Sequence, residues 1–467
     1  MTIGSTKSVD YYPFPFWLAY TTSLLKRDLP AVVTGIDGVV HDMTAEEFFN
    51  KIWKIKPDVL LTELTTISLR ADLELLKRIK EDLGSIIIIA GNYATAVSRE
   101  LLIQNLFIDF ILVGEYEITA KELLNCLIDS GLDKLSNIKG IAYRSSDNNS
   151  IIVNESRGLL TDLNELPFPD REDFPATIYP DFTLYSPCIS IISSRGCPAG
   201  CIYCNERHVL YNSPKYRMRN PSSVVDEMEY CIQKYGAKQF YFDDQSFVVN
   251  QKHVHDICSE LINRNIIIPW TCMGDAMFSD YEMLKIMARA GCIGMKFGVE
   301  SAVPEILKNI HKPLKLKQVE KVVEWCGELG IRTHATFCLG LPGETASTVQ
   351  ESMAFMEKIN IDTAQVSKAI PYPGTPMYDW AKKNNYLTTS DLEAFDGAGK
   401  AILNYPDFSN RELDRWYEIF YKKVSRKKLF KYLKEPIQSF SIVQEMWRRK
   451  GFFSVIRSIS TFINRGI

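Results

Sequence analysis

The chain has 467 residues, a formal net charge of −3, 46% hydrophobic residues and 24% charged residues. This length exceeds what one ordinary core holds, so we expect two or three domains of a globular protein. The small net charge gives no field that favours nucleic acid. The polar N-terminal decapeptide lacks the apolar stretch of a signal peptide, and no run approaches the roughly 18 apolar residues that span a bilayer. We therefore expect a cytoplasmic protein without nucleic-acid partners.

Residues 1–135 alternate apolar runs with amphipathic stretches. The expected strands are 29–40, 57–64, 85–91 and 108–117, and the expected helices are 44–56, 68–84, 98–106 and 119–131. Thr44 is an N-cap residue type at the start of the first of these helices. Continuous apolar strands separated by helices indicate a parallel sheet covered on both faces. This part is therefore predicted to be an α/β, doubly wound (Rossmann-like) domain whose ligand lies beyond the carboxyl ends of the strands.

Residues 136–184 have a different pattern. A hairpin is predicted from "IKGIAYRSSDNNSIIVNES", with its tip at 147–149. The stretch that follows, "LNELPFPDREDFPATIYP", is rich in proline, which ends regular structure. We expect it to be a linker that runs over a surface.

A second alternating array occupies residues 185–400. Its expected strands are 189–195, 239–245, 266–274, 292–299, 331–339 and 363–370, and its expected helices are 221–235, 251–264, 280–290, 304–329 and 346–359. Six successive strand–helix units predict a partial (β/α)6 barrel of the TIM type. In such barrels the chemistry lies at the carboxyl ends of the strands.

Residues 401–467 are predicted to be a helical C-terminal region. Its stretch "YKKVSRKKLFKYLK" has seven lysines or arginines and no acidic residue. We expect a helix with a solvated basic face that packs on the barrel. The alternative is contact of this basic tail with a membrane surface or an anionic carrier.

Three of the eleven cysteines, in "RGCPAGCIYC", have the spacing of metal ligands. They are Cys197, Cys201 and Cys204, in a C-x3-C-x2-C pattern after the first barrel strand. One reading is a structural zinc site, with His208 or Cys188 as the fourth ligand. Another is an iron–sulfur cluster with one iron left open, and the third is ordinary buried cysteine. Spacing alone leaves all three open.

The wider context "SRGCPAGCIYCNE" resembles the cluster loop of radical SAM enzymes, C-x3-C-x-aromatic-C, with Tyr203 in the aromatic position. The resemblance implies that Cys197, Cys201 and Cys204 hold a [4Fe-4S] cluster. Its free iron would chelate S-adenosylmethionine, and an electron from the reduced cluster would cleave this molecule to a 5′-deoxyadenosyl radical.

Later strand ends extend the resemblance. "FYFDDQSF" is similar to the segment that accepts a hydrogen bond from the methionine ammonium, which implies a role for Asp243 and Asp244. One of this pair is also expected to cap the next turn. "GVESA" resembles the motif whose Glu300 and Ser301 would lie near the ribose and carboxylate.

The last two motifs follow the fifth and sixth strands. "LGLPGET" resembles the backbone segment under the adenine, which implies a role for Gly340, Pro342 and Gly343. "PYPGTPMY" resembles a further signature of the same family. The resemblance covers residues 185–380. It assigns no catalytic proton or hydrogen donor, although Cys338, Tyr372 and Tyr378 are candidates.

The N-terminal motifs "KPDVLLTELTT", "IIIIAGNYAT" and "FIDFILVGEYEITAKELL" resemble the cobalamin-binding domain that precedes the barrel in one radical SAM subgroup. Gly114 and Glu115 match its closing "GE" feature. The sequence departs from that domain in three ways. It lacks a D-x-H-x-x-G motif, so no lower axial histidine is expected. It lacks the usual first strand, and "GNY" at 91–93 replaces a pair of glycines.

The leading hypothesis is cobalamin-dependent methylation of an unactivated carbon by a radical SAM enzyme. The alternative within the same class is a cobalamin-independent radical dehydration, cyclisation or rearrangement with a vestigial N-terminal domain. A different class would be a zinc-stabilised scaffold without catalysis. The expected partners are a small-molecule, lipid or peptide substrate and an electron donor such as flavodoxin or ferredoxin.

Overall fold

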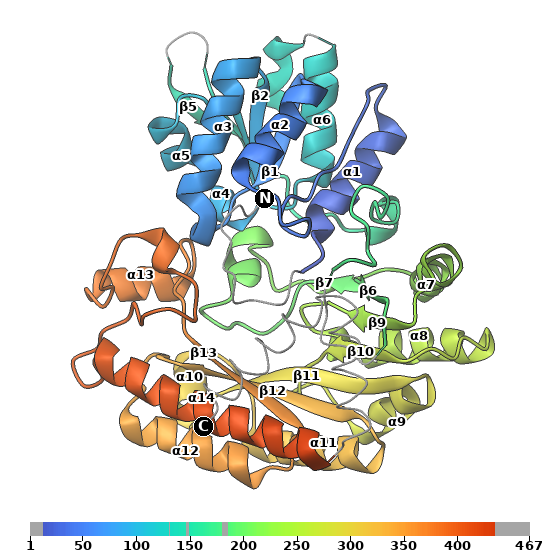
Figure 1. Cartoon of the computed structure of the whole chain (residues 1–467), viewed down its shortest axis with the longest axis vertical. Coiled ribbons are helices and arrows are strands. Elements are labelled where there is room, and N and C mark those ends of the chain that lie inside the picture. The colour runs from blue at the N-terminus through green and yellow to red at the C-terminus, as the bar shows by residue number, and fades with distance from the viewer. Residues whose placement is uncertain (1–12, 130, 146–148, 180–184, 435–467) are drawn as a thin grey trace.

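The computed structural model describes residues 13–129, 131–145, 149–179 and 185–434. It consists of two α/β units, with the N-terminal unit above the larger second unit in Figure 1. The predicted fold class, an α/β protein with a Rossmann-like sheet followed by a six-stranded parallel sheet and a C-terminal helix, is confirmed. Segments that follow strands of both units, among them the turn after β2 and the residues after Cys204, lie in the region between the two sheets.

The N-terminal sheet has the strand order β1-β2-β3-β4-β5, in which the first three strands are parallel and the last two antiparallel. The strands are β1 (Val59–Glu63), β2 (Ile86–Ala90), β3 (Phe110–Leu112), β4 (Ile141–Arg144) and β5 (Ile151–Val153). The last two form the predicted hairpin, and its tip lies partly outside the described residues.

Helices cover both faces of this sheet. One face buries Phe48, Leu75 and Leu101 against the strands, and the other buries Tyr116 and Leu123. On the first face lie α2 (Ala45–Ile55), α3 (Leu69–Leu83), α4 (Asn92–Ala96) and α5 (Ser98–Gln104), and on the second lie α1 (Phe16–Asp28) and α6 (Glu117–Ile128). The expected cap of α2 forms, with the Thr44 hydroxyl accepting from the Glu47 backbone.

The strand expected at 29–40 is wrong, because these residues form no strand. Polar groups of this segment instead form hydrogen bonds with residues of the linker. The Gly35 backbone N–H donates to the Asp173 carboxylate at 2.6 Å, and the Tyr179 hydroxyl donates to Asp37 at 2.7 Å. Asp37 also accepts from the Val39 N–H at 2.9 Å, which closes a tight turn. The segment is therefore fastened to the linker, and β1 is an edge strand among the described residues.

The second unit is a six-stranded parallel sheet of order β13-β12-β11-β10-β9-β6. The strands are β6 (Cys188–Ile191), β9 (Gln239–Phe242), β10 (Trp270–Met273), β11 (Cys292–Glu300), β12 (Arg332–Leu339) and β13 (Thr363–Lys368). The helices between them are α7 (Pro221–Tyr235), α8 (Gln251–Asn263), α9 (Tyr281–Arg289), α10 (Pro304–Asn309), α11 (Leu316–Glu328) and α12 (Ala346–Lys358). The six expected strand–helix units are thus confirmed.

The single helix expected at 304–329 is wrong, because two helices, α10 and α11, occupy this stretch. His311 between them has a φ of +56°, which no right-handed helix contains. Pro313 follows, and a proline restricts the residue before it away from helical geometry. The break takes Lys312 off the helix surface.

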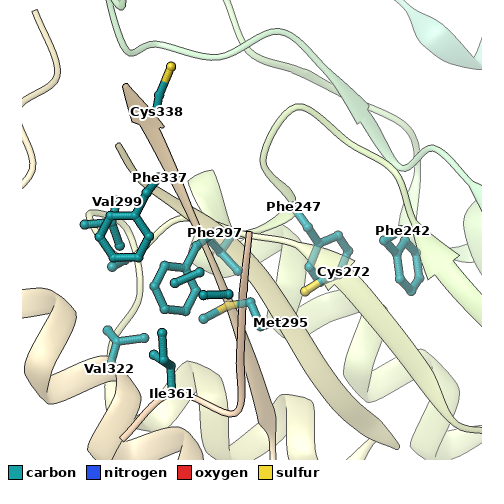
Figure 2. Packing of buried hydrophobic residues seen from close by; sticks show 14 of the residues in the cluster. Phe242, Phe247, Cys272, Met295, Phe297, Val299, Val322, Phe337, Cys338 and Ile361 are labelled. Carbon is teal, nitrogen blue, oxygen red and sulfur yellow. The ribbon is translucent and has the colours of Figure 1, made fainter. Parts of the chain in front are cut away.

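An aromatic layer forms the core of this unit. Trp270 packs edge to face with both Phe242 and Phe247, and Phe297 and Phe337 continue the layer across the sheet. In Figure 2, Cys338 lies at the end of β12 with its sulfur directed away from this layer. These side chains belong to the hydrophobic core of the second unit.

The linker and the C-terminal helix both pack on this second unit. Arg171 of the linker lies 2.7 Å from Glu227 of α7, and both side chains are buried. In α14 (Asn410–Lys434), Phe420 packs on Phe337 with ring centroids 5.3 Å apart, and Lys427 donates to the Met356 carbonyl. The expected packing of the helical tail is confirmed for this part, and residues 435–467 lie outside the described residues. In the described part of the chain, no helix is long and apolar enough to cross a membrane.

Candidate functional site

The cysteine loop begins at a short antiparallel pair, β7 (Ser194–Arg195) with β8 (Arg217–Met218). Gly196 then turns the chain with a φ of +95°, and a side chain there would collide with the Lys215 carbonyl. The Gly196 N–H donates to the Gln245 side-chain oxygen at 2.9 Å. Only glycine fits this position, so the direction in which the loop leaves β7 is fixed.

The three thiols of the loop are largely withdrawn from solvent. Burial raises the pKa of Cys201 to about 11 and that of Cys204 to about 12, and it also raises the pKa of Cys197. Ligation of a metal by these thiols would release their protons, because the thiolate is the metal ligand.

The side chains around the loop fit an iron–sulfur cluster better than a zinc ion. The His208 ring nitrogen Nε2 lies 3.1 Å from the Cys201 carbonyl oxygen, so one of the two candidates for the fourth zinc ligand is engaged with the backbone. Among the described residues, no three His, Cys, Asp or Glu side chains converge closely enough to hold one metal ion. A cubane cluster distributes its thiolates over different irons, so its ligands need not converge on one point.

Lys312 is a buried cation near the loop that the sequence reasoning missed. Its Nζ lies 3.3 Å from Glu300 and 3.5 Å from Asp275. Burial opposes its charge, but the two carboxylates raise its pKa overall, and its charge in turn favours the thiolate of Cys201. The missed signal is the proline after Lys312, which could have ended the predicted helix before it.

The two aspartates after β9 have different surroundings. Asp243 lines a cavity between the two units. Asp244 is buried and accepts from the Ser193 N–H at 3.3 Å, the Ser193 hydroxyl at 2.9 Å and the Ser194 hydroxyl. Burial raises the pKa of Asp244 to about 6, although the serines oppose this. Asp244 thus holds the segment before the cysteines. The expectation that one of the pair caps the next turn stays a prediction.

The side chains of Glu300 and Ser301 also have different surroundings. Glu300 ends β11 with a φ of +65°, at an irregularity in the pairing with β12, and its carboxylate faces Lys312. Ser301 is fully buried, and its hydroxyl lies 3.3 Å from the Ser352 hydroxyl and accepts from the Val303 N–H at 3.2 Å. A direct contact of Ser301 with S-adenosylmethionine stays a prediction. Its observed contacts shape the turn that begins α10.

The glycine-rich segment after β12 is packed by the protein itself. Gly340 and Gly343 have φ values of +85° and +88°, and side chains there would meet Leu413 and Asn309 respectively. Asn309 Nδ2 donates to the Pro342 carbonyl at 3.0 Å. These residues form a rigid backbone turn, and its position under the adenine stays a prediction.

A cavity of about 980 Å³ lies between the two units. The N-terminal sheet contributes the carboxyl end of β1 and the turn after β2, with Glu63, Gly91 and Asn92, and the second unit contributes Asn205 and Asp243. The side-chain oxygens of Asn92 and Asn205 are both buried, and neither has a hydrogen-bond partner in the described part of the chain. Tyr372 lines the same cavity. This region is where the strand ends of both sheets meet.

The model of the Radical SAM superfamily matches residues 191–356. An uncharacterized methyltransferase, PH0819, of Pyrococcus horikoshii is 28% identical over 382 residues, which are 82% of this chain and 81% of that protein. Anaerobic magnesium-protoporphyrin IX monomethyl ester cyclase of Rubrivivax gelatinosus is 25% identical and covers 93% of this chain and 80% of its own length.

Among solved structures, the radical S-adenosylmethionine methyltransferase TsrM from Kitasatospora setae, with cobalamin and a [4Fe-4S] cluster bound, has a TM-score of 0.66. It is 18% identical and covers 87% of this chain and 79% of its own, which shows a common two-unit fold. Residues 191–356 of the chain thus form a domain of the radical SAM superfamily. Its cofactors accordingly include a [4Fe-4S] cluster and S-adenosylmethionine.

Proposed function

We propose that this enzyme methylates an unactivated carbon of a small-molecule substrate in a cobalamin-dependent radical reaction. The observation that carries the proposal is the cavity between the strand ends of the N-terminal sheet and the segment that follows Cys204. Ligands of open α/β sheets bind at this edge, and so do those of barrels. One cavity therefore borders both sites. The methyltransferase names of PH0819 and TsrM support the same reaction class.

The residues of the second unit fit the cluster and its S-adenosylmethionine. Cys197, Cys201 and Cys204 would hold the cluster, beside the charge of Lys312. When bound, the cluster supplies an electron that cleaves S-adenosylmethionine to a 5′-deoxyadenosyl radical. The electron would come from a donor such as flavodoxin or ferredoxin.

The proposed contacts of S-adenosylmethionine act in two ways. Asp243 and Glu300 present carboxylates, and a carboxylate suits a cationic amine or a ribose hydroxyl. Five other proposed contacts shape the surrounding backbone: Asp244, Ser301, Gly340, Pro342 and Gly343. Tyr203, the remaining one, packs partly buried against the core of the second unit.

The cavity also has groups that fit cobalamin. The unpartnered oxygens of Asn92 and Asn205 are hydrogen-bond acceptors, and the rim of a corrin carries primary amides that donate. Gly91 has a φ of +94°, so the chain turns there without a side chain at the cavity wall. Asn92 thus serves as a ligand-facing residue in this proposal.

Cobalamin retention tests the N-terminal part of the proposal. The chain is reconstituted anaerobically with iron, sulfide and hydroxocobalamin, desalted and examined by absorption spectroscopy. We expect near-stoichiometric corrinoid in the wild type and less in Asn92→Leu, whereas the exposed control Gln104→Leu should match the wild type. A wild-type chain that keeps no corrinoid would refute the methylase proposal and leave a cobalamin-independent radical reaction.

Cys201→Ala tests the cluster assignment. The variant is expected to lose 5′-deoxyadenosine formation from S-adenosylmethionine under strong reductant while it stays folded, because Cys201 is not one of the residues of the hydrophobic core of the second unit. Cys126→Ala in α6 is the control and should keep the activity. Chromatography of the nucleoside and circular dichroism are the measurements. Product formation by Cys201→Ala would show that the thiols do not hold the cluster.

A further inference from the structure

A buried ion network joins the N-terminal unit to the start of the cysteine loop. Arg195, two residues before Cys197, lies 3.0 Å from Glu115 through Nη1 and 2.6 Å from Glu117 through Nη2. The other oxygen of Glu115 lies 2.6 Å from Arg217. The two glutamates stand at the junction of β3 and α6, so the network crosses from one unit to the other.

The network is closed to water. Its four side chains are between 2% and 6% exposed. The rings of Trp17 and Tyr20 flank the Arg195 guanidinium, with centroids 4.8 and 5.2 Å from its central carbon. Nη1 donates a hydrogen bond to Glu115, whereas Nη2 meets Glu117 as a close ion pair without hydrogen-bond geometry. One hydrogen bond, one ion pair and two flanking rings together restrict the orientation of the guanidinium.

Arg195 lies close to the first cysteine in the chain, so the orientation of its side chain bears on the direction of the cysteine loop. Only Gly196 separates it from Cys197, and the geometry of Gly196 is fixed by the close approach of Lys215. On the side of the second unit, Asp244 holds Ser193 and Ser194, and Gln245 holds Gly196. The loop entry is thus held from one side by the second unit and from the other by the N-terminal unit.

We propose that Glu115 and Glu117 of the N-terminal unit are positioning residues for the iron–sulfur site, acting through Arg195 on the direction of the cysteine loop. The proposal goes beyond methylation, because it assigns the N-terminal unit a role in the cluster site that does not depend on bound cobalamin. The ion-pair partners of the two glutamates are arginines, and the proposed effect of the glutamates on the loop passes through the Arg195 guanidinium.

A network that only held the two units together would give different results when its residues are replaced. A buried ion pair contributes little net stability compared with an apolar pair of similar size, whereas it sets direction through its hydrogen-bond geometry. Replacement of Arg195 and Glu117 together by apolar residues should therefore keep the fold and lose the orientation. Glu115 would retain Arg217 in that variant, so no charge is left unpaired.

The test uses the full chain, reconstituted with iron and sulfide and without cobalamin. The variants are Glu117→Gln and the pair Arg195→Met with Glu117→Leu. The matched control is Glu122→Gln, also in α6, whose partner is Arg157 of the linker. Iron loss to a chelator and the EPR spectrum of the reduced cluster, with and without S-adenosylmethionine, are measured, and thermal melting reports the fold.

We expect both variants to lose iron about 10- to 100-fold faster than the wild type, as for other outer-sphere partners of metal ligands, and to show an altered response of the EPR spectrum to S-adenosylmethionine. The control should match the wild type in both. If Glu117→Gln fails to fold, the paired variant decides.

A folded paired variant with wild-type iron loss and EPR spectrum would overturn the proposal. A paired variant that cannot fold would overturn it as well, because the contact would then be required for folding and not for position. A chain that keeps its cluster normally but binds no cobalamin would contradict only the proposed methylation, so the two failures are distinguishable.

Discussion

Lys312 is a buried ammonium group that faces two carboxylates and lies near the thiol of Cys201. In Lys312→Met, Glu300 and Asp275 lose this partner, and breaking a buried ion pair on one side costs about 3–5 kcal/mol. The free energy of unfolding should fall accordingly. The loss of positive charge should also make the cluster potential more negative, because net charge helps to set it.

Denaturant titration and potentiometry measure these two effects. The control is Lys308→Met, which removes a lysine 78% exposed in an ion pair on the surface of α10. It should change neither quantity, because exposed pairs contribute about 0–1 kcal/mol. An unchanged potential in a folded Lys312→Met would show that this charge does not act on the cluster.

The stability of the folded protein is expected to depend on pH through Glu344. Burial raises its pKa from 4.5 to about 8, although the backbone N–H of Gly340 donates to the carboxyl. Between these values the folded state holds a proton that the unfolded state lacks. Stability therefore falls as the pH rises, by about 1.4 kcal/mol per unit.

From pH 6.5 to 8 the expected loss of unfolding free energy from Glu344 is about 2 kcal/mol. Glu344→Gln should remove it, because the amide is neutral throughout and its oxygen can accept from the same N–H. Urea titrations of both proteins at the two pH values give the difference. Parallel curves for the two proteins would mean that Glu344 is ionised in the folded state at pH 6.5.

At the scale of elements, the cysteine loop contains its own matched pair of glycines. Gly196 has a positive φ and faces the Lys215 carbonyl, whereas the nearest atom to a side chain at Gly200 would be His311 Cβ at 3.9 Å. We expect Gly196→Ala to cost about 1–3 kcal/mol in strain and to lower the iron content. Gly200→Ala should cost less than about 0.5 kcal/mol. Iron analysis and thermal melting compare the two, and equal iron contents would contradict the prediction.

Most elements could be predicted because each depends on neighbours in the sequence. The strands β6, β9 and β10 are short runs dominated by apolar residues, and the cap of α2 is a local hydrogen bond. The strand expected at 29–40 failed for a non-local reason. Gly35 and Asp37 bond to linker residues more than a hundred positions away, and their apolar pattern does not encode this.

The residues of the site also fall into those that could be predicted from the sequence and those that could not. The three cysteines could be predicted from spacing, because their loop is one contiguous segment. The contacts of Lys312 and of Arg195 could not, since their partners come from elsewhere in the chain. The separate surroundings of Asp243 and Asp244 also escaped prediction, because adjacent residues at a strand end point to different sides.

For the whole molecule, α1 ties the two units together. Phe16, Tyr20 and Leu24 belong to the core of the second unit, whereas Trp17 and Leu18 also pack against the N-terminal sheet. A chain beginning at residue 185 would lack this helix and the partners of Arg195. We expect such a fragment to bind a hydrophobic dye and to aggregate, as measured by fluorescence and size-exclusion chromatography. A monodisperse fragment with a cooperative melt would contradict this.

The place of α1 also bears on how the protein is made. About 160 residues separate the end of α1 at Asp28 from the beginning of β6 at Cys188. At a synthesis rate of about 5–20 residues per second, the ribosome needs roughly 10 to 30 s to reach the first strand of the second unit, against whose core α1 packs. During that interval Phe16 and Tyr20 of α1 cannot yet pack into the core of the second unit. The nascent chain thus depends on the N-terminal sheet, or on a chaperone, to shelter its first helix until the second unit emerges.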